Sequence, residues 1–340
     1  MNPISVYFHP LFLQHETGEH PESKERLVVA KHVLEGTDLA LDWVTPKPAS
    51  TGSIARVHDP EYIKSVRETA EQGGGWLDWD TAVSPHSYEA ALLAAGSGLM
   101  AVDDALETGR LAFMLVRPPG HHATYSRGMG FCLFNNIAVA AAYAVEELGL
   151  ERVLIVDWDV HHGNGTQAAF YEDPRVLFFS VHQGGHYPGT GLVKEVGSGA
   201  GVGYTVNVPL RAGEGDAAVV MAFSSLLLPL ARTFKPQLLL VSAGYDGQLG
   251  DPLGDLRFSK ASFQWMAAQL KELAGEVGAA GPLCFLEGGY VPALAADSIV
   301  VTLQGLSEGS PRLERPISDD ERADVEATIS ELKPYWKGTL

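Results

Sequence analysis

The sequence has few cysteines and no long apolar run. Only two of its 340 residues are cysteines, Cys132 and Cys284, and both lie in apolar stretches. Two such cysteines are more typical of buried thiols than of a disulfide, and they fit a reducing cytoplasm. No stretch of 18 or more apolar residues occurs, so the sequence predicts no membrane span. The first residues also lack the basic and apolar regions of a secretion signal. We therefore expect a cytoplasmic protein.

Basic residues are scarce as well. The chain has 24 Lys and Arg against 42 Asp and Glu, which gives a formal net charge of −18 at pH 7. Such a charge disfavours direct binding to nucleic-acid phosphates and favours cationic partners. Because acidity also serves solubility, the charge alone does not identify a partner.

No linker, repeat or low-complexity run divides the chain, so we expect one catalytic domain over residues 1–340. Six apolar runs are typical of strands buried on both faces of a sheet, at residues 5–8, 111–116, 152–156, 175–181, 237–243 and 282–288. Helical patterns separate them, at residues 87–106, 135–148, 216–234, 259–277 and 293–300. This alternation predicts an α/β fold with a mostly parallel central sheet and helices on both faces. A last helix is expected at about 318–336, where Ser318 and Glu321 form a capping box.

Reactive side chains follow four of the expected strands. The segments that come after these strands are RPPGHH (117–122), DWDVHHG (157–163), GYDGQLGDP (244–252) and GY (289–290). In open α/β sheets, ligands bind outside the carboxyl ends of the strands. The four segments together therefore predict one site at one edge of the sheet.

The segment DWDVHHG has the spacing of a metal site. In an extended chain Asp157, Asp159 and His161 point to the same side. A catalytic zinc usually has three protein ligands and one open position, and Asp246 is the best candidate for a third ligand from elsewhere. Two carboxylates and one imidazole without a thiolate suit Zn²⁺ first, with Fe²⁺ or Co²⁺ as alternatives. A lone Asp after a strand is often only a helix N-cap, but the tandem histidines of RPPGHH favour a functional site.

Several motifs resemble those of the histone deacetylase superfamily, closest to its class II and bacterial amidohydrolase-like branch, which includes acetylpolyamine amidohydrolases. They lie in the family's order between about residues 5 and 305: RPPGHHATYSRGMGFCLFNN, DWDVHHGNGTQ, YPGTG, SAGYDGQLGDPLG and LEGGY. The resemblance implies the arginase-deacetylase fold, with zinc at the bottom of a narrow tunnel. It also implies zinc-dependent hydrolysis of acetyl or other acyl groups from lysine side chains or related amines.

The resemblance also assigns roles to residues. It implies zinc ligands at Asp159, His161 and Asp246. It implies a catalytic group of His121, His122, Asp157, Asn164 and Tyr290, and a substrate tunnel lined by Gly130, Phe131, Tyr187, Leu253 and Gly288. In this family the glycine carbonyl of the GF pair holds the substrate amide, and two aromatic rings form opposite walls of the tunnel.

The two tandem histidines are expected to differ. By the family's pairing, His121 faces Asp157 and His122 faces Asn164. A buried carboxylate favours the imidazolium form, whereas a neutral amide does not. We therefore expect His121 to be charged and His122 to be the neutral base, with Tyr290 donating a hydrogen bond to the developing oxyanion.

Members of the family also bind monovalent cations, so the resemblance implies structural K⁺. One site would use Asp157, Ser180 and the main-chain carbonyls of Asp159, His161 and Val181. A second would use the carbonyls of Phe170, Asp173, Val176 and Tyr204.

Alternatives remain for the reaction and the substrate. A ureohydrolase of the arginase type would need a two-metal DAHxD-like run, which the sequence lacks. A catalytically idle module that binds acetylated ligands would be expected to lose a catalytic residue, yet all are present. The resemblance leaves the substrate open between an acylated lysine in a peptide or protein, an acetylated polyamine and a small amide, and Leu253 stands where polyamine-selective relatives carry a glutamate. Four acidic residues should border the tunnel mouth, where they either attract such cations or belong to a solvated loop: Glu16, Glu19, Glu22 and Glu25.

Overall fold

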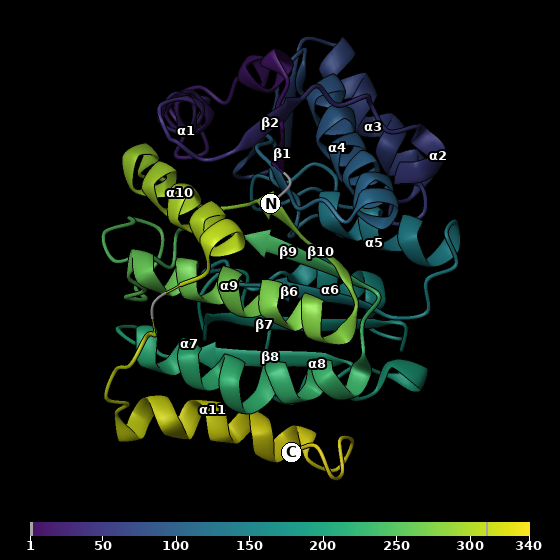
Figure 1. Ribbon diagram of the computed structural model, residues 1–340. Helices are drawn as coiled ribbons and strands as arrows, with labels where there is room; N and C mark the ends of the chain where they lie inside the picture. The colour runs from purple at the N-terminus through teal and green to yellow at the C-terminus, as the bar shows by residue number, and fades with distance from the viewer. Residues whose placement is uncertain (1–2, 311) are drawn as a thin grey trace.

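An eight-stranded parallel sheet forms the centre of the protein (Figure 1). The computed structural model describes residues 3–310 and 312–340. The strand order is β2-β1-β5-β10-β9-β6-β7-β8, and every neighbouring pair is parallel. The strands are β1 (Ile4–Tyr7), β2 (Leu41–Val44), β5 (Ala112–Met114), β6 (Val153–Asp157), β7 (Val176–Gln183), β8 (Thr205–Leu210), β9 (Leu238–Ala243) and β10 (Ala280–Leu286). A separate antiparallel hairpin consists of β3 (Gly75–Asp78) and β4 (Thr81–Val83).

The inner strands match the sequence prediction, whereas the two edge strands gave no clear pattern. Every residue of β6, β7 and β9 is buried, as expected for strands covered on both faces. Strand β2 is largely half-buried, so its sequence shows no continuous apolar run. Strand β8 carries Asn207 and Pro209, and proline is tolerated there because the strand lies at the edge of the sheet.

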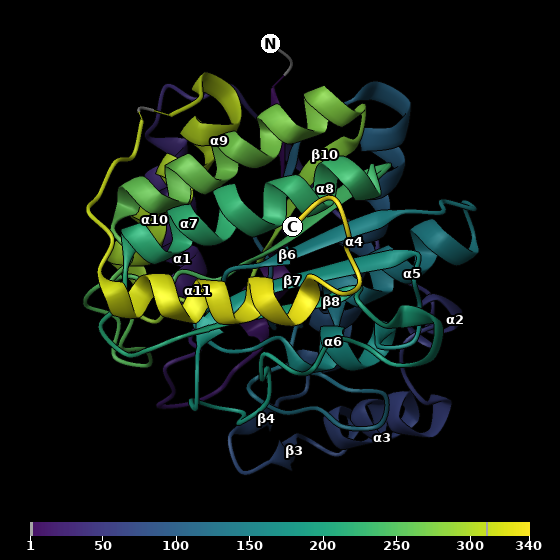
Figure 2. The ribbon, with the colours of Figure 1, turned by 90° about the horizontal axis from the view of Figure 1, so that it is seen from below.

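Helices cover both faces of the sheet, which confirms the predicted fold class (Figure 2). Helices α4, α5 and α6 pack against one face, and α7 to α10 lie on the other. The helices are α1 (Glu25–Glu35), α2 (Thr51–Ile54), α3 (Pro60–Glu71), α4 (Ser87–Thr108), α5 (Asn136–Glu146), α6 (Asn164–Phe170), α7 (Asp216–Ala222), α8 (Leu228–Phe234), α9 (Lys260–Val277), α10 (Pro292–Glu308) and α11 (Asp319–Leu332).

Helix α11 protects the edge strand β8. It begins with a capping box in which the Ser318 hydroxyl accepts from the Glu321 N–H and the Glu321 carboxylate accepts from the Ser318 N–H. Its Thr328 hydroxyl donates to the Asn207 carbonyl of β8 at 2.8 Å. By covering β8, helix α11 limits the hydrogen bonding of this edge strand to strands of other chains.

One helical stretch is apolar enough to resemble a membrane span. Residues Asp216–Phe234, which comprise α7, a π-helical turn (Phe223–Leu227) and α8, are 19 residues long with a mean hydropathy of 1.7. However, 61% of the apolar window is buried inside the protein, where α7 and α8 pack against α9. The stretch therefore has the burial of a core helix.

A buried ion cluster joins the N-terminal segment to the sheet. The Glu22 carboxylate is fully buried and accepts from Arg117 Nε at 2.5 Å, from Arg117 Nη2 at 2.6 Å and from Arg26 Nη1 at 3.0 Å. Burial alone would raise the pKa of Glu22, but the two arginines lower it to about 2. Glu22 is thus not part of an acidic tunnel mouth, and none of Glu16, Glu19, Glu22 and Glu25 is among the residues that line the cavity described below, so the expectation of an acidic mouth formed by these four residues is wrong.

Replacing Glu22 with alanine should destabilise the fold by about 3–5 kcal/mol, because two buried guanidinium groups would lose their counter-charge. Urea denaturation would measure this loss. The stabilisation by Glu22 should be present above its ordinary pKa of 4.5 and disappear as the pH falls towards about 2. Glu16→Ala is the matched control in the same segment and should leave the transition nearly unchanged, since its ion pair with Lys24 is exposed. Equal effects of the two variants would contradict the assignment.

Candidate metal and catalytic site

The order of the strands brings the reactive segments together. Strands β5, β10, β9 and β6 are consecutive neighbours in the sheet, and all end at the same edge. Asp157 is the last residue of β6, Asp246 follows β9, and Tyr290 follows β10. The tandem histidines follow β5. The structure therefore has the four reactive segments at one edge of the sheet, as the sequence predicted.

Asp159, His161 and Asp246 form a buried cluster with the donor atoms of a metal site. One possible ligand atom from each lies within 4.8 Å of the others. His161 Nδ1 lies 3.1 Å from Asp159 Oδ1 and 3.1 Å from Asp246 Oδ2. Donors bound tetrahedrally at about 2.0 Å from a metal would lie roughly 3.3 Å apart, so these atoms have suitable spacing.

Backbone groups hold both carboxylates in place. Asp159 Oδ2 accepts from the Gly288 N–H at 2.8 Å, and Asp246 Oδ1 accepts from the Val160 N–H at 2.9 Å. A Cβ at Gly288 would lie 2.0 Å from Asp246 Oδ2, so only glycine fits behind the cluster. Gly288 thus supports the base of the site.

The charge of the cluster also fits a cation. Burial alone would lower the pKa of His161, but hydrogen bonding to Asp159 and Asp246 raises it to about 10. Two buried carboxylates around one imidazole therefore favour a positive charge between them. An oxygen and nitrogen donor set without thiolate suits Zn²⁺ or another Lewis-acid metal.

The tandem histidines have the unequal partners that were predicted. His121 Nδ1 lies 3.0 Å from Asp157 Oδ2, and His122 Nδ1 lies 2.8 Å from Asn164 Oδ1. Burial lowers the pKa of His121, but Asp157 and other nearby carboxylates raise it to about 10. Burial and the charges of His121 and His161 lower the pKa of His122 well below its usual range. These shifts favour a charged His121 and a neutral His122.

The Asn164 amide fixes which nitrogen of His122 is free. Its Nδ2 donates to the His122 carbonyl at 3.4 Å and approaches Met129 Sδ at 3.6 Å, so Oδ1 faces the imidazole. Since an amide oxygen only accepts, His122 must carry its hydrogen on Nδ1. The Nε2 lone pair then remains available to take a proton.

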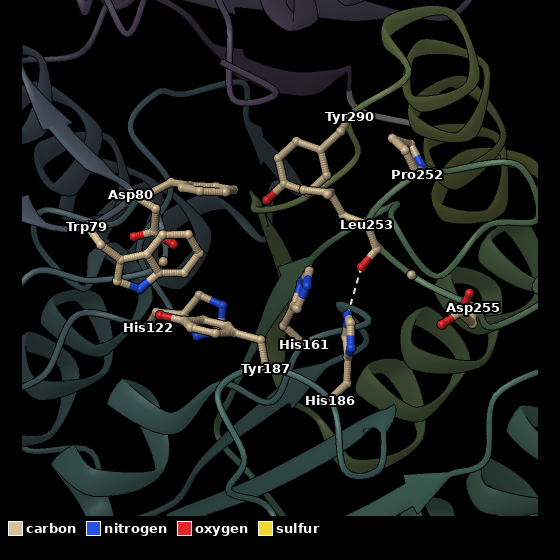
Figure 3. Close-up of a pocket in the computed structure, with 13 residues that line it drawn as sticks. Trp79, Asp80, His122, His161, His186, Tyr187, Pro252, Leu253, Asp255 and Tyr290 are labelled. Atoms are coloured by element: carbon tan, nitrogen blue, oxygen red, sulfur yellow. Dashed lines mark hydrogen bonds between the residues drawn. The ribbon is translucent and has the colours of Figure 1, made fainter. Parts of the chain in front are cut away.

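A cavity of about 250 Å³ leads to this cluster (Figure 3). Phe131 and Tyr187 lie in its walls, and the Tyr290 hydroxyl points into it. Burial raises the pKa of Tyr290 well above its usual range, so the hydroxyl stays protonated and can donate. Phe131 has φ of 69°, a conformation that costs a non-glycine residue energy and is typical of functional sites.

Two distant groups anchor the turn that carries Tyr290. Its N–H donates to Asp251 Oδ2 at 2.6 Å. Arg26 Nε donates to the Gly289 carbonyl at 2.7 Å, and the guanidinium carbon lies 5.1 Å from the centroid of the Tyr290 ring. The hydroxyl is therefore held in place by α1 and by the loop after β9.

Comparison with known proteins identifies the family. The histone deacetylase domain model matches residues 20–306. Histone deacetylase 10, chloroplastic, of Oryza sativa is 41% identical over 325 residues, which cover 90% of this chain and 73% of the relative. Polyamine deacetylase HDAC10 of Homo sapiens is 40% identical over 336 residues, which cover 93% of this chain and 49% of the relative. The chain belongs to the histone deacetylase family.

The structural comparison agrees with this family assignment. The crystal structure of the HDA15 HD domain has a TM-score of 0.92 and 34% sequence identity, and the match covers 100% of this chain and 97% of that chain. The predicted resemblance and the prediction of a deacetylase-family hydrolase acting on amide bonds are both confirmed.

Sequence reasoning missed several residues that line the cavity of this histone deacetylase family member. They are Trp79, Asp80, His186, Pro252, Gly254 and Asp255. The His186 ring stacks on His161 with centroids 5.1 Å apart, and its Nε2 donates to the Leu253 carbonyl at 2.9 Å (Figure 3). The only feature of the sequence that could have pointed to His186 is its position next to Tyr187.

The residues expected to bind K⁺ lie in two groups. Asp157 and Ser180 are direct neighbours on β6 and β7. Asp173 lies in the loop between α6 and β7, and the Tyr204 carbonyl accepts from the Phe178 N–H at 2.9 Å. Both K⁺ sites remain predictions.

Proposed function

We propose that this protein is a zinc-dependent deacylase that hydrolyses the acyl amide of a lysine side chain or a related amine. The observation that carries the proposal is a buried cluster of Asp159, His161 and Asp246 at the end of the cavity, beside one charged and one neutral histidine. Zinc bound to this cluster would polarise the amide carbonyl and lower the pKa of the attacking water.

The side chains supply the remaining steps. Nε2 of His122 takes the proton of the water as its oxygen attacks the carbonyl carbon. The Tyr290 hydroxyl donates a hydrogen bond to the oxyanion that develops on the carbonyl oxygen. His122 then returns the proton to the amine nitrogen as the C–N bond breaks, which leaves a carboxylic acid and a free amine. The acid then gives its proton to the amine, so the products are a carboxylate and an ammonium. The charged His121–Asp157 pair orients the site and stabilises negative charge.

The residues that line the cavity favour an aliphatic chain as substrate. Phe131 and Tyr187 line it as aromatic walls, and Leu253 adds an apolar side chain. Methylene groups of an acylated lysine or an acetylated polyamine suit such walls. A relative is named a polyamine deacetylase, but the apolar Leu253 favours acylated lysine in a peptide or protein over a polyamine.

Two further parts of the proposal concern bound cations and location. The carbonyl oxygens of Asp159 and His161 accept no hydrogen bond from the described residues, so they are available to a structural K⁺ beside Asp157 and Ser180.

We place the protein in the cytoplasm because of its cysteine use, although the rice relative is named chloroplastic.

Turnover on matched substrates tests the proposal. The zinc-loaded protein should hydrolyse an acetyl-lysine peptide, and a panel that adds longer acyl-lysines and acetylated polyamines would define the substrate. Binding of acetyl-lysine peptide without turnover would support the idle binding module and exclude the enzyme.

Tyr290→Phe should lower kcat by about 10²–10³-fold, because one donor to the oxyanion is removed. Metal content and peptide binding should remain near those of the unchanged protein. Steady-state kinetics and metal analysis would measure both. Tyr335→Phe, at an exposed tyrosine after α11, is the control and should keep full activity. An unchanged kcat for Tyr290→Phe would show that this tyrosine only packs.

A further inference from the structure

We propose that Trp79 binds a cationic group of the substrate, an ammonium or guanidinium near the acylated amine, at the mouth of the cavity. The inference rests on the proposed deacylase function and adds a specificity-determining residue to it. Trp79 would contribute to substrate binding rather than to the chemical step.

Trp79 is exposed and yet belongs to the cavity. It lies in the turn between β3 and β4, its side chain is 78% exposed, and it lines the cavity together with Asp80 (Figure 3). Trp76 in the same hairpin is 61% exposed but is not among the residues that line the cavity. An indole kept in water at a cavity mouth offers a large contact surface with little loss of side-chain freedom on binding.

Hydrogen bonds on both sides of Trp79 fix the turn that carries it. The Trp79 N–H donates to Asp78 Oδ1 at 2.7 Å, and Asp78 Oδ2 accepts from Arg127 Nη2 at 2.8 Å. The Asp80 carbonyl accepts from His20 Nε2 at 3.1 Å. The backbone of this turn is therefore ordered before a ligand arrives, which lowers the cost of binding.

The charges around the mouth select the kind of group that would bind there. The charged side chains that line the cavity, apart from its histidines, are Asp80 and Asp255, and no Lys or Arg lines it in the described part of the chain. The nearby Arg127 is paired with Asp78. Two carboxylates and the negative face of an indole attract a cation and repel an anion. The net charge of −18 acts in the same direction.

The position of Trp79 also fixes where the cation lies on the substrate. Figure 3 shows Trp79 and Asp80 on one side of the cavity, with Leu253 and Asp255 on the other and His161 between them. When an acyl chain reaches His161, the group beside Trp79 must belong to the part of the substrate outside the cavity. A second basic residue of a peptide and a further ammonium of a polyamine share this chemistry.

Kinetics with charge-matched substrates tests the inference. The substrates are acetyl-lysine peptides whose neighbouring residue is arginine, its neutral isostere citrulline or glutamate, and an acetylated diamine compared with its hydroxyl analogue. Trp79→Ala should raise KM for the arginine peptide or the diamine about 3- to 10-fold, with kcat nearly unchanged. The citrulline, glutamate and hydroxyl substrates should change much less. Trp79→Phe should restore part of the difference.

Trp76→Ala is the matched control, since it removes an exposed tryptophan from the same hairpin. It should leave every KM unchanged. Equal increases in KM for charged and neutral substrates in Trp79→Ala, or no increase at all, would overturn the inference while the deacylase function stands. Failure of the unchanged protein to hydrolyse any acylated substrate would overturn the proposed function and this inference with it.

Discussion

Replacing Asp246 or Asp159 with alanine should give a folded protein that retains almost no zinc. Each carboxylate offers one oxygen to the cluster, and His161 Nδ1 lies 3.1 Å from both. Catalytic zinc sites usually have three protein ligands, so the loss of one leaves too few donors. Elemental analysis of the purified variants would measure bound zinc, and turnover should fall with it.

A control separates the loss of a ligand from the loss of negative charge. Asp255 also lines the cavity, but it accepts from Gln183 Nε2 at 3.2 Å and is not part of the cluster. Asp255→Ala should therefore retain zinc. Circular dichroism should show the same helix content in all three variants. Full zinc occupancy in Asp159→Ala or Asp246→Ala would refute the assignment of the ligands.

The sequence was sufficient to predict the central strands and the meeting of Asp159, His161 and Asp246, because the apolar strands and the spacing of Asp159 and His161 are local patterns. Strands β6 and β9 are apolar at nearly every position, and their ends carry the reactive side chains. Asp159 and His161 are two residues apart, so one extended segment presents both. Asp246 lies beside them because β9 pairs directly with β6.

Contacts between segments that are far apart in the chain have no comparable pattern in the sequence. Glu22 lies among acidic residues that look alike in the sequence, yet its carboxylate binds Arg117, 95 residues away, inside the protein. Trp79 and Asp80 reach the cavity only because a short hairpin lies beside it. His186 stacks on His161 from a different loop. None of these positions has a periodicity or spacing that predicts its partner.

His122→Ala should lower kcat by about 10²–10⁴-fold while bound zinc is retained, because the proton acceptor is lost and the metal ligands are not. His121→Ala should lose less activity at high pH, since its role is electrostatic rather than proton transfer. Metal analysis and kcat measured as a function of pH would compare the two variants. Equal losses at every pH would contradict unequal roles for the pair.

The partner of His122 gives the sharpest test of its role. Asn164→Asp would place a negative charge at about the 2.8 Å distance that now separates Asn164 Oδ1 from His122 Nδ1, and this charge should raise the pKa of His122. The acidic limb of kcat/KM against pH reports the essential base of the free enzyme. Since a base with a higher pKa is protonated at higher pH, the limb should move to higher pH and activity below neutrality should fall.

Asn164→Ala separates the added charge from the lost hydrogen bond. It removes the acceptor without adding a charge, so kcat should fall while the acidic limb does not move to higher pH. The rings of His121 and His122 have centroids 4.0 Å apart, so the shift belongs to the coupled pair. An Asn164→Asp profile that overlays that of the unchanged protein, or that moves to lower pH, would refute His122 as the base oriented by Asn164.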